Sequence, residues 1–317
     1  MPDPHADRLL ILAPEAAAYA ELVAAADLGP LAVAVAGDVA GARAHAAQCN
    51  LVLGVPALVA QLLDRLPRLT WVQSTYAGVD ALCRPGLRRD YTLTGVREVF
   101  GGLMREYVLG WILALERDLF TAREDQRHGR WQPRPYRGLE GLTLGVCGLG
   151  SIGQAVARAG AAFGMRVVGY RRTAAPCTAV ARVYSGNGFH PFLAEADYLV
   201  VVLPATPASD GLIDAVALAA LKPDAVLVNV GRGRSVVEAD LVAALRAGTL
   251  RAAVLDVFAS EPLPPASPLW RLPNAYLTPH TAAVSFPPAI FARFAANYRR
   301  YRAGAALHDV IDFARGY

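Results

Sequence analysis

Short apolar runs alternate with amphipathic stretches along the first hundred residues of the chain. Runs of four to eight apolar residues, bounded by turn residues, are typical of buried β-strands. They cover Arg8–Ala13, Leu31–Ala36, Leu51–Val55 and Leu69–Ser74. The stretches between them predict helices over Glu15–Ala26, Val39–Gln48 and Ala57–Leu66. Such alternation predicts a parallel sheet with helices on both faces.

A second series of the same kind begins at Leu142. Strands are expected near 142–147, 166–170, 198–203, 224–230, 252–257 and 275–278, with helices that include Gln154–Gly164, Asp210–Leu221 and Val236–Ala247. One long helix over Gly102–Phe120 connects the two series, and a last helix is expected over Pro288–Arg302. The pattern therefore predicts an α/β fold of two parallel-sheet domains, Rossmann-like or flavodoxin-like. We expect a first domain at 1–98, completed by the returning segment 286–317, and a second at 99–285.

A glycine turn opens the second series. The strand that ends at Cys147 leads into Gly-Leu-Gly-Ser-Ile-Gly, and a helix and a second strand follow at the expected distances. In this context Gly148 permits a tight turn, Gly150 lets a pyrophosphate approach the backbone, and Gly153 lets helix and strand pack closely. Amides at the helix start can bind phosphate oxygens. The sequence thus predicts a dinucleotide site at Gly148, Gly150, Ser151, Ile152 and Gly153.

The residues after the next strand indicate which dinucleotide is bound. Sites that prefer NAD usually have Asp or Glu there, to accept hydrogen bonds from the ribose hydroxyls. This chain has Arg171, Arg172 and Thr173 instead, with no carboxylate nearby. Guanidinium groups and a hydroxyl suit a 2′-phosphate. We therefore expect NADPH to be preferred, with NADH possible.

Composition narrows the setting. No apolar run approaches the ~20 residues of a membrane span, and the first seven residues lack the pattern of a secretory signal. Cys49, Cys83, Cys147 and Cys177 are scattered without metal-ligand spacing, which favours reduced thiols in the cytoplasm and no metal site. The net charge is only +4, and the arginines are dispersed. We expect no nucleic-acid or membrane partner.

Three side chains suited to catalysis follow separate strands of the second series. Arg232 lies between two glycines, Glu261 follows the strand near 252–257, and His280 follows the strand near 275–278. In a parallel sheet these strand ends share one edge, where ligands bind. Arg232 would bind a carboxylate and polarise the neighbouring carbonyl, and His280 would give a proton to the developing alkoxide. Glu261 would hold the imidazole in orientation and favour its protonated form.

Four motifs resemble the D-isomer-specific 2-hydroxyacid dehydrogenase family. They are Gly-Leu-Gly-Ser-Ile-Gly (148–153), Asn-Val-Gly-Arg-Gly (229–233), Asp-Val-Phe-x-x-Glu-Pro-Leu (256–263) and Thr-Pro-His (278–280). The segment 261–270 and the final Arg-Gly-Tyr resemble the glyoxylate/hydroxypyruvate reductase branch, which uses NADPH. The resemblance implies an active site in the cleft between the two domains, with Arg232, Glu261 and His280 as the catalytic trio.

The resemblance implies further contacts. The loop 74–80 matches one whose amides bind the substrate carboxylate, which makes Tyr76, Ala77 and Gly78 substrate-binding residues together with Arg232 and His280. Asp256 matches a carboxylate near the nicotinamide carboxamide. Other cofactor contacts that the resemblance implies are Met104, Leu203, Pro204, Thr206, Val230 and Gly231. The family forms dimers through the cofactor domain, so a homodimer is expected.

The function predicted from the sequence is therefore NADPH-dependent reduction of a small 2-oxoacid, such as glyoxylate or hydroxypyruvate, to the D-2-hydroxyacid. Larger 2-oxoacids such as phenylpyruvate stay open as substrates. A formate enzyme is disfavoured, because related ones usually have Gln where Glu261 stands. A dinucleotide-sensing binding protein of the co-repressor type is the alternative from another class. Proteins of that type normally carry long tails, whereas this chain ends soon after its last predicted helix.

Overall fold

The computed structural model describes residues 7–317, which form two compact units. Unit 1 comprises Met1–Val99 and Ser285–Tyr317, and unit 2 comprises Phe100–Val284. The first seven residues were expected to lack a secretory signal. Residues 1–6 of this segment lie outside the described residues. Within residues 7–317, no helix combines the length and the apolar character needed to cross a membrane.

Unit 1 is built on a five-stranded parallel sheet in the order β2-β1-β3-β4-β5. Its strands are β1 (Asp7–Leu12), β2 (Leu31–Ala36), β3 (Leu51–Gly54), β4 (Trp71–Ser74) and β5 (Thr92–Thr94). This is the flavodoxin-like order, in which the chain direction across the sheet reverses between β1 and β3. The four predicted strands are present. The pattern missed β5, because its three residues, Thr-Leu-Thr, contain no run of apolar residues.

Helices cover both faces of this sheet. They are α1 (Ala16–Ala25), α2 (Val39–Ala46), α3 (Pro56–Ala60) and α10 (Pro287–Arg302), with short 3₁₀ turns η1 (Leu63–Arg65) and η2 (Asp80–Leu82). The helix expected over Ala57–Leu66 ends early at Ala60. There the Gln61 side chain donates to the carbonyl oxygen of Ala57 at 2.9 Å, and the backbone continues with the tighter three-residue bonds of η1.

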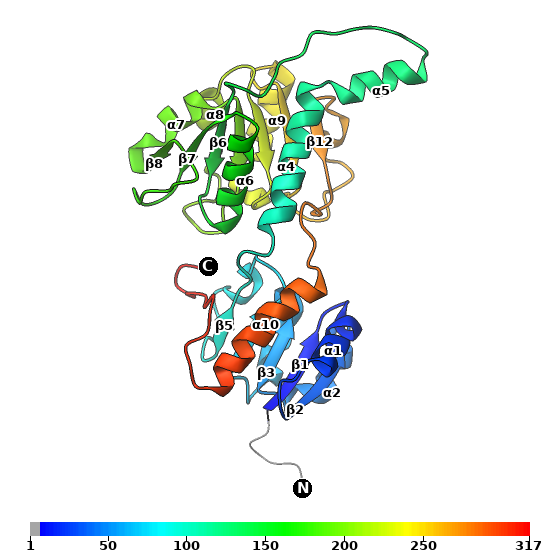
Figure 1. The fold of residues 1–317 in the computed structure, drawn as a ribbon, viewed down its shortest axis with the longest axis vertical. Coiled ribbons are helices and arrows are strands. Elements are labelled where there is room, and N and C mark those ends of the chain that lie inside the picture. The colour runs from blue at the N-terminus through cyan, green and yellow to red at the C-terminus, as the bar shows by residue number, and fades with distance from the viewer. Residues whose placement is uncertain (1–6) are drawn as a thin grey trace. The chain divides into compact units, whose positions relative to one another are not determined.

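Helix α10 comes from the far end of the chain and lies along the sheet of unit 1 (Figure 1). Its Phe294 ring stacks on Trp71 of β4, with the ring centroids 5.4 Å apart. Beside this stack, buried Asn297 donates to the side-chain oxygen of buried Gln73 at 3.2 Å. The C-terminal segment therefore supplies part of the core of unit 1.

Unit 2 contains a seven-stranded parallel sheet in the order β12-β11-β10-β9-β6-β7-β8. The strands are β6 (Thr143–Cys147), β7 (Arg166–Tyr170), β8 (Arg182–Tyr184), β9 (Tyr198–Val201), β10 (Val226–Asn229), β11 (Ala252–Leu255) and β12 (Ala275–Leu277). From β6 the chain first adds β7 and β8 on one side and then crosses over to add β9 to β12 on the other, as in a Rossmann sheet. Ligands bind at such a crossover point, here between β6 and β9. The two sheets confirm the predicted fold class.

Two helical layers cover the sheet of unit 2. Helices α4 (Gly101–Glu116) and α6 (Ser151–Ala162) share one buried core, and α7 (Phe189–Glu195), α8 (Ala215–Ala219) and α9 (Glu238–Ala247) share the other (Figure 1). The β-strands between the layers are buried on both faces, which explains their continuous apolar runs.

Two helix predictions in unit 2 were wrong. The single helix over Gly102–Phe120 is interrupted at Asp118, whose φ of +49° is left-handed, a conformation that Asp adopts more readily than most residues. After it, α5 (Leu119–Arg127) and the following segment extend away from the sheet (Figure 1). The helix over Asp210–Leu221 shrinks to α8, because Ile213 pairs with Val236 as a β-bridge and Asp214 caps the helix at Ala217 N.

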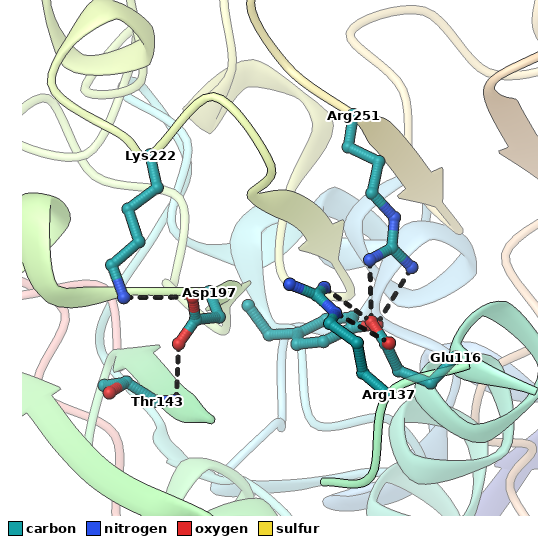
Figure 2. Close-up of polar contacts among 7 residues, drawn as sticks. Glu116, Arg137, Thr143, Asp197, Lys222 and Arg251 are labelled. Carbon is teal, nitrogen blue, oxygen red and sulfur yellow. Dashed lines mark hydrogen bonds and ion pairs between the residues drawn. The ribbon is translucent and has the colours of Figure 1, made fainter. Parts of the chain in front are cut away.

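A buried carboxylate anchors the segment that returns from α5. Glu116 accepts hydrogen bonds from Arg137 at 2.9 and 3.1 Å, from Arg251 at 2.7 Å and from Tyr198 at 2.5 Å (Figure 2). Burial raises the pKa of Glu116, but these hydrogen bonds outweigh it and hold that pKa at about 2.

A second ion pair lies beside this cluster. Asp197 pairs with Lys222 at 2.9 Å and accepts from the amide of Thr143 at 2.7 Å (Figure 2). Thr143 begins β6, Asp197 immediately precedes β9, and Arg251 immediately precedes β11. Both groups of charges therefore lie at the amino ends of the strands, opposite the edge where the predicted site residues follow the strands.

Candidate active site

The glycine turn after β6 has no room for side chains at two of its three glycines. A Cβ on Gly148, whose φ is +107°, would lie 2.4 Å from the carbonyl oxygen of Val202, and one on Gly153 would lie 1.9 Å from that of Gly148. Gly150 instead faces open space and is the N-cap of α6. The turn therefore leaves a gap beside the start of a twelve-residue helix, as a bound pyrophosphate requires.

The basic residues predicted to bind a 2′-phosphate lie next to this turn. The amide of Gly148 donates to the carbonyl oxygen of Tyr170 at 2.9 Å, so the end of β7 is tied to the glycine turn. Arg171, directly after Tyr170, is half-buried, and its amide donates to Tyr184 of β8 at 3.0 Å. Arg172 and Thr173 are exposed. This places two guanidinium groups at the strand end where an adenosine ribose is bound in Rossmann sheets.

The loops after β9 and β10 meet at the same edge. Gly231 is buried against Leu203, and a Cβ there would lie 2.7 Å from the amide nitrogen of Leu203. The loop after β9 is fixed by Ser209, whose hydroxyl donates to the carbonyl oxygen of Pro204 at 2.6 Å and accepts from the amide of Thr206 at 3.0 Å. The predicted cofactor contacts on these two loops are thus adjacent in the fold.

The turn that carries Arg232 is shaped by Asn229, the buried last residue of β10. The Asn229 side chain accepts from the amide of Gly231 at 3.1 Å and donates to the carbonyl oxygen of Arg232 at 3.0 Å. Arg232 is half-buried and donates to the carbonyl oxygen of Gly231 at 2.8 Å. A single amide side chain therefore fixes the backbone on both sides of the guanidinium-bearing residue.

Gly233 brings this turn against the segment that carries Glu261. A Cβ on Gly233 would lie only 1.8 Å from the carbonyl carbon of Phe258. The amide of Phe258 donates to Oε1 of Glu261 at 2.9 Å, and the amide of Ala259 donates to Glu238 of α9 at 2.8 Å. Glu261 is thus held through one oxygen, which leaves Oε2 for another partner.

That partner is His280, whose Nδ1 lies 2.8 Å from Oε2 of Glu261. His280 has a left-handed φ of +55°, and its amide donates to the carbonyl oxygen of Asp256 at 2.8 Å. Its side chain is 56% exposed. The carboxylate engages one ring nitrogen, so the other, Nε2, is the nitrogen that can exchange a proton with a ligand.

Asp256 organises the chain around His280. This carboxylate is 1% exposed and accepts hydrogen bonds from the Thr278 hydroxyl at 2.6 Å and from the amides of Thr281 and Ala282 at 2.8 and 3.0 Å. The Thr278 hydroxyl lies 2.6 Å from the hydroxyl of Tyr107 on α4. Burial raises the pKa of Tyr107 to about 12, so its hydroxyl keeps its proton at neutral pH.

The loop predicted to bind the substrate carboxylate follows β4 in unit 1. The Ser74 hydroxyl accepts from the amide of Tyr76 at 3.0 Å and donates to its carbonyl oxygen at 2.7 Å. The Tyr76 amide is therefore engaged, whereas within residues 7–317 the amides of Ala77 and Gly78 have no hydrogen-bond partner. Two consecutive amides are thus available to an anion.

Comparison with known proteins shows the family to which the chain belongs. The family model for the NAD binding domain of D-isomer specific 2-hydroxyacid dehydrogenases matches residues 109–282, more than half of the chain. The chain belongs to the D-isomer-specific 2-hydroxyacid dehydrogenase family. This membership confirms the family predicted from the motifs, and the predicted enzyme class of an NAD(P)-dependent 2-hydroxyacid reductase.

Individual members of the family are similar over most of their length. Glyoxylate/hydroxypyruvate reductase A of Serratia proteamaculans (strain 568) is 34% identical over 268 residues, which cover 81% of this chain and 84% of that protein. The crystal structure of a family protein from Aeromonas salmonicida subsp. salmonicida A449 matches with a TM-score of 0.93 and 44% identity, over 97% of this chain and 99% of that one.

A third similar protein has been crystallised with a cofactor. The NADPH-dependent glyoxylate/hydroxypyruvate reductase of Sinorhizobium meliloti, crystallised with NADP and sulfate, matches with a TM-score of 0.88 and 30% identity. The match covers 98% of this chain and all of that one.

Within this dehydrogenase fold, the structure brings most of the predicted residues of unit 2 to one sheet edge. Glu261 contacts His280, and Arg232 lies in the turn packed against Phe258. Met104 is half-buried on α4 against the core shared with α6, Val230 is buried after β10, and Asp256 is engaged by the segment 278–282. Tyr76, Ala77 and Gly78 lie in unit 1.

Several polar residues that support this edge were not predicted from the sequence. Asn229 and Thr278 are the first residues of the motifs 229–233 and 278–280. Their place in these motifs was the only sequence feature that could have indicated a supporting role. Tyr107 lies within the helix expected over Gly102–Phe120, where nothing in the sequence distinguished its hydroxyl as functional. Glu238, which holds the Glu261 segment, left no signal that distinguishes it from any acidic residue at the start of a helix.

Proposed function

We propose that this chain reduces a small 2-oxoacid to the D-2-hydroxyacid with NADPH. The observation that carries the proposal is the His280–Glu261 pair, which lies at the same sheet edge as the glycine turn. A dinucleotide reductase needs a hydride source and a proton source side by side. NADPH supplies the hydride when it is bound, and the pair can supply the proton.

Each member of the trio has a distinct role. His280 donates a proton from Nε2 to the carbonyl oxygen as that oxygen becomes an alkoxide, and regains one from solvent, to which the exposed ring has access. Glu261 binds Nδ1, which orients the ring. Arg232 provides a fixed positive charge for the substrate carboxylate and the polarised carbonyl.

Three features of unit 2 support NADPH as the cofactor. The glycine turn leaves space at the start of α6 for a pyrophosphate. Arg171 and Arg172 follow β7, where NAD-preferring sites usually carry an acidic residue. The similar reductase of Sinorhizobium meliloti is NADPH-dependent and was crystallised with NADP.

Unit 1 would serve as the substrate domain, with 1–98 completed by 286–317. Its amides at Ala77 and Gly78 are suited to hold the carboxylate of a 2-oxoacid. Glyoxylate and hydroxypyruvate are the first candidates, because the similar proteins of Serratia proteamaculans and Sinorhizobium meliloti are glyoxylate/hydroxypyruvate reductases.

We further propose a homodimer formed through unit 2. The segment from α5 to residue 138 extends from this unit and exposes large apolar side chains. Trp131 is 94% exposed, and Leu119 and Tyr136 are more than half exposed. Such a concentration of apolar surface is typical of a protein interface.

A substrate panel tests the proposed activity. NADPH oxidation is followed with glyoxylate, hydroxypyruvate and phenylpyruvate, and the hydroxyacid made from hydroxypyruvate is analysed by chiral chromatography. We expect the highest kcat/KM with one of the two small oxoacids and a D product. A preference for phenylpyruvate would shift the assignment to larger 2-oxoacids, and no turnover with any oxoacid, or an L product, would overturn the proposal.

A further inference from the structure

A partly buried row of three polar groups connects α4 to the segment that carries His280. It runs from the Tyr107 hydroxyl to the Thr278 hydroxyl, and from there to Oδ1 of Asp256, with two distances of 2.6 Å. Tyr107 is anchored beside Trp111, with the ring centroids 6.2 Å apart. The row therefore starts in a packed helix and ends at the Asp256 carboxylate, which binds the backbone next to His280.

The direction of donation in this row is determined by its chemistry. The Thr278 hydroxyl has a single proton, and it donates that proton to Asp256, whose carboxylate already accepts two backbone amides. The oxygen of Thr278 can then only accept from Tyr107. Tyr107 thus donates to Thr278, and Thr278 donates to Asp256.

The carboxylate at the end of the row acts on the backbone that places His280. Asp256 binds the amides of Thr281 and Ala282 after the histidine, and its own carbonyl oxygen accepts the amide of His280. Thr278, two residues earlier, binds the same carboxylate. His280 is thereby held in a left-handed conformation that a non-glycine residue adopts at a cost.

The geometry points to Tyr107 and Thr278 as positioning residues for proton transfer by His280. Their hydroxyls fix the rotation of the Asp256 carboxylate, which in turn fixes the backbone from 278 to 282. The backbone then sets the orientation of the His280 imidazole toward Glu261. This inference rests on the proposed function, because it assigns His280 the proton transfer. Neither hydroxyl touches the imidazole, so their effect passes through Asp256 and the backbone.

Three variants test the row in the full-length enzyme. Thr278→Val removes the hydroxyl at nearly constant volume, Thr278→Ser retains it, and Tyr107→Phe removes the first donor while keeping the ring beside Trp111. Steady-state kcat and the KM for NADPH are measured with the best 2-oxoacid, together with Tm. Tyr298→Phe is the matched control, because it removes a buried tyrosine hydroxyl that donates to Asp7 at 3.0 Å in unit 1.

We expect kcat to fall about tenfold to hundredfold in Thr278→Val and about threefold to tenfold in Tyr107→Phe, because small displacements of a catalytic group have effects of this size. The KM for NADPH stays within about twofold, and Thr278→Ser restores kcat. Adding Tyr107→Phe to Thr278→Val lowers kcat little further, because the row is already broken. Tyr298→Phe lowers Tm and leaves kcat unchanged.

A kcat within about twofold of wild type in both Thr278→Val and Tyr107→Phe would overturn the inference, whatever the Tm. An equal loss of kcat in Thr278→Ser would also overturn it. If Thr278→Val does not fold, Tyr107→Phe alone decides. His280→Ala is assayed in parallel: wild-type turnover in that variant would instead refute the proposed role of the histidine, and the inference with it.

Discussion

The imidazole of His280 and the carboxylate of Glu261 form a pair that is fixed from both sides, with 2.8 Å between Nδ1 and Oε2. Glu261 is held by the amide of Phe258, and His280 by the carbonyl oxygen of Asp256. The two partners follow different strands, β11 and β12. Their contact therefore depends on loops whose backbone positions are set by neighbouring side chains rather than by the sheet alone.

At Gly233 these loops pack so closely that there is no room for a side chain. A Cβ at this position would lie 1.8 Å from the carbonyl carbon of Phe258, so Gly233→Ala must separate the Arg232 turn from the Glu261 segment. We expect kcat/KM to fall at least about hundredfold, since a displacement near 1 Å has that effect on a catalytic site. Gly41→Ala in α2 is the control, because the new Cβ meets nothing closer than 3.5 Å, and its kinetics match wild type. Wild-type kinetics in Gly233→Ala would contradict the packing described.

We expect cofactor preference to depend on Arg171 and Arg172, the basic residues after β7. In the double variant Arg171→Ala with Arg172→Ala, we expect the KM for NADPH to rise about tenfold to hundredfold, the value of one or two charge-assisted hydrogen bonds to a phosphate. The KM for NADH stays within about twofold. Arg182→Ala on β8 controls for the general positive charge of this surface and leaves both constants unchanged. An equal rise for both dinucleotides would show that these arginines do not bind the 2′-phosphate.

Acid stability of unit 2 depends on Glu116. Its pKa of about 2 in the folded chain lies below the ordinary value of 4.5, so its ionised form stabilises the fold above about pH 5. That contribution is lost as pH falls from about 4.5 toward 2, and it amounts to up to about 3 kcal/mol. Urea unfolding at pH 5 and pH 3 measures it. Glu116→Gln is less stable at pH 5 and loses less stability on acidification than wild type, whereas exposed Glu124→Gln follows wild type. Identical pH dependence in Glu116→Gln would contradict the assigned pKa.

The proposed dimer can be tested at its most exposed side chains. We expect wild type to sediment as a dimer at micromolar concentration, and Leu119→Ser with Trp131→Ser to sediment as a monomer, because both changes remove apolar surface from the segment after α4. Phe163→Ser changes an exposed apolar residue at the end of α6 and leaves the dimer intact. A monomeric wild-type protein, or a double variant that stays dimeric, would refute this interface.

The sequence was informative where local periodicity and backbone requirements coincide. Continuous apolar runs identified the long strands, and three glycines at fixed spacing identified the turn after β6, where Gly148 and Gly153 have no room for a side chain and Gly150 leaves open space. It was less informative where the outcome depended on contacts distant in the chain. The break at Asp118 is hidden by apolar residues that continue through Leu119 and Phe120, and β5 and β8 are short strands in which polar residues interrupt the apolar run.

The supporting residues of the candidate site could not be predicted for the same reason, because their contacts join residues that are distant in the chain. His280 and Glu261 could be proposed from their places after strands, but Tyr107 and Thr278 meet across 171 positions of sequence. No local pattern reports such a contact. A tyrosine in an amphipathic helix is interpreted as a core residue until its hydroxyl is seen to have a partner.

The most direct test of the central claim is the rate of NADPH oxidation by wild type and His280→Ala with glyoxylate and hydroxypyruvate. Removing the proposed proton donor should lower kcat at least about hundredfold, while the KM for NADPH stays within about twofold because the glycine turn is unchanged. Turnover by His280→Ala at the wild-type rate would contradict the account.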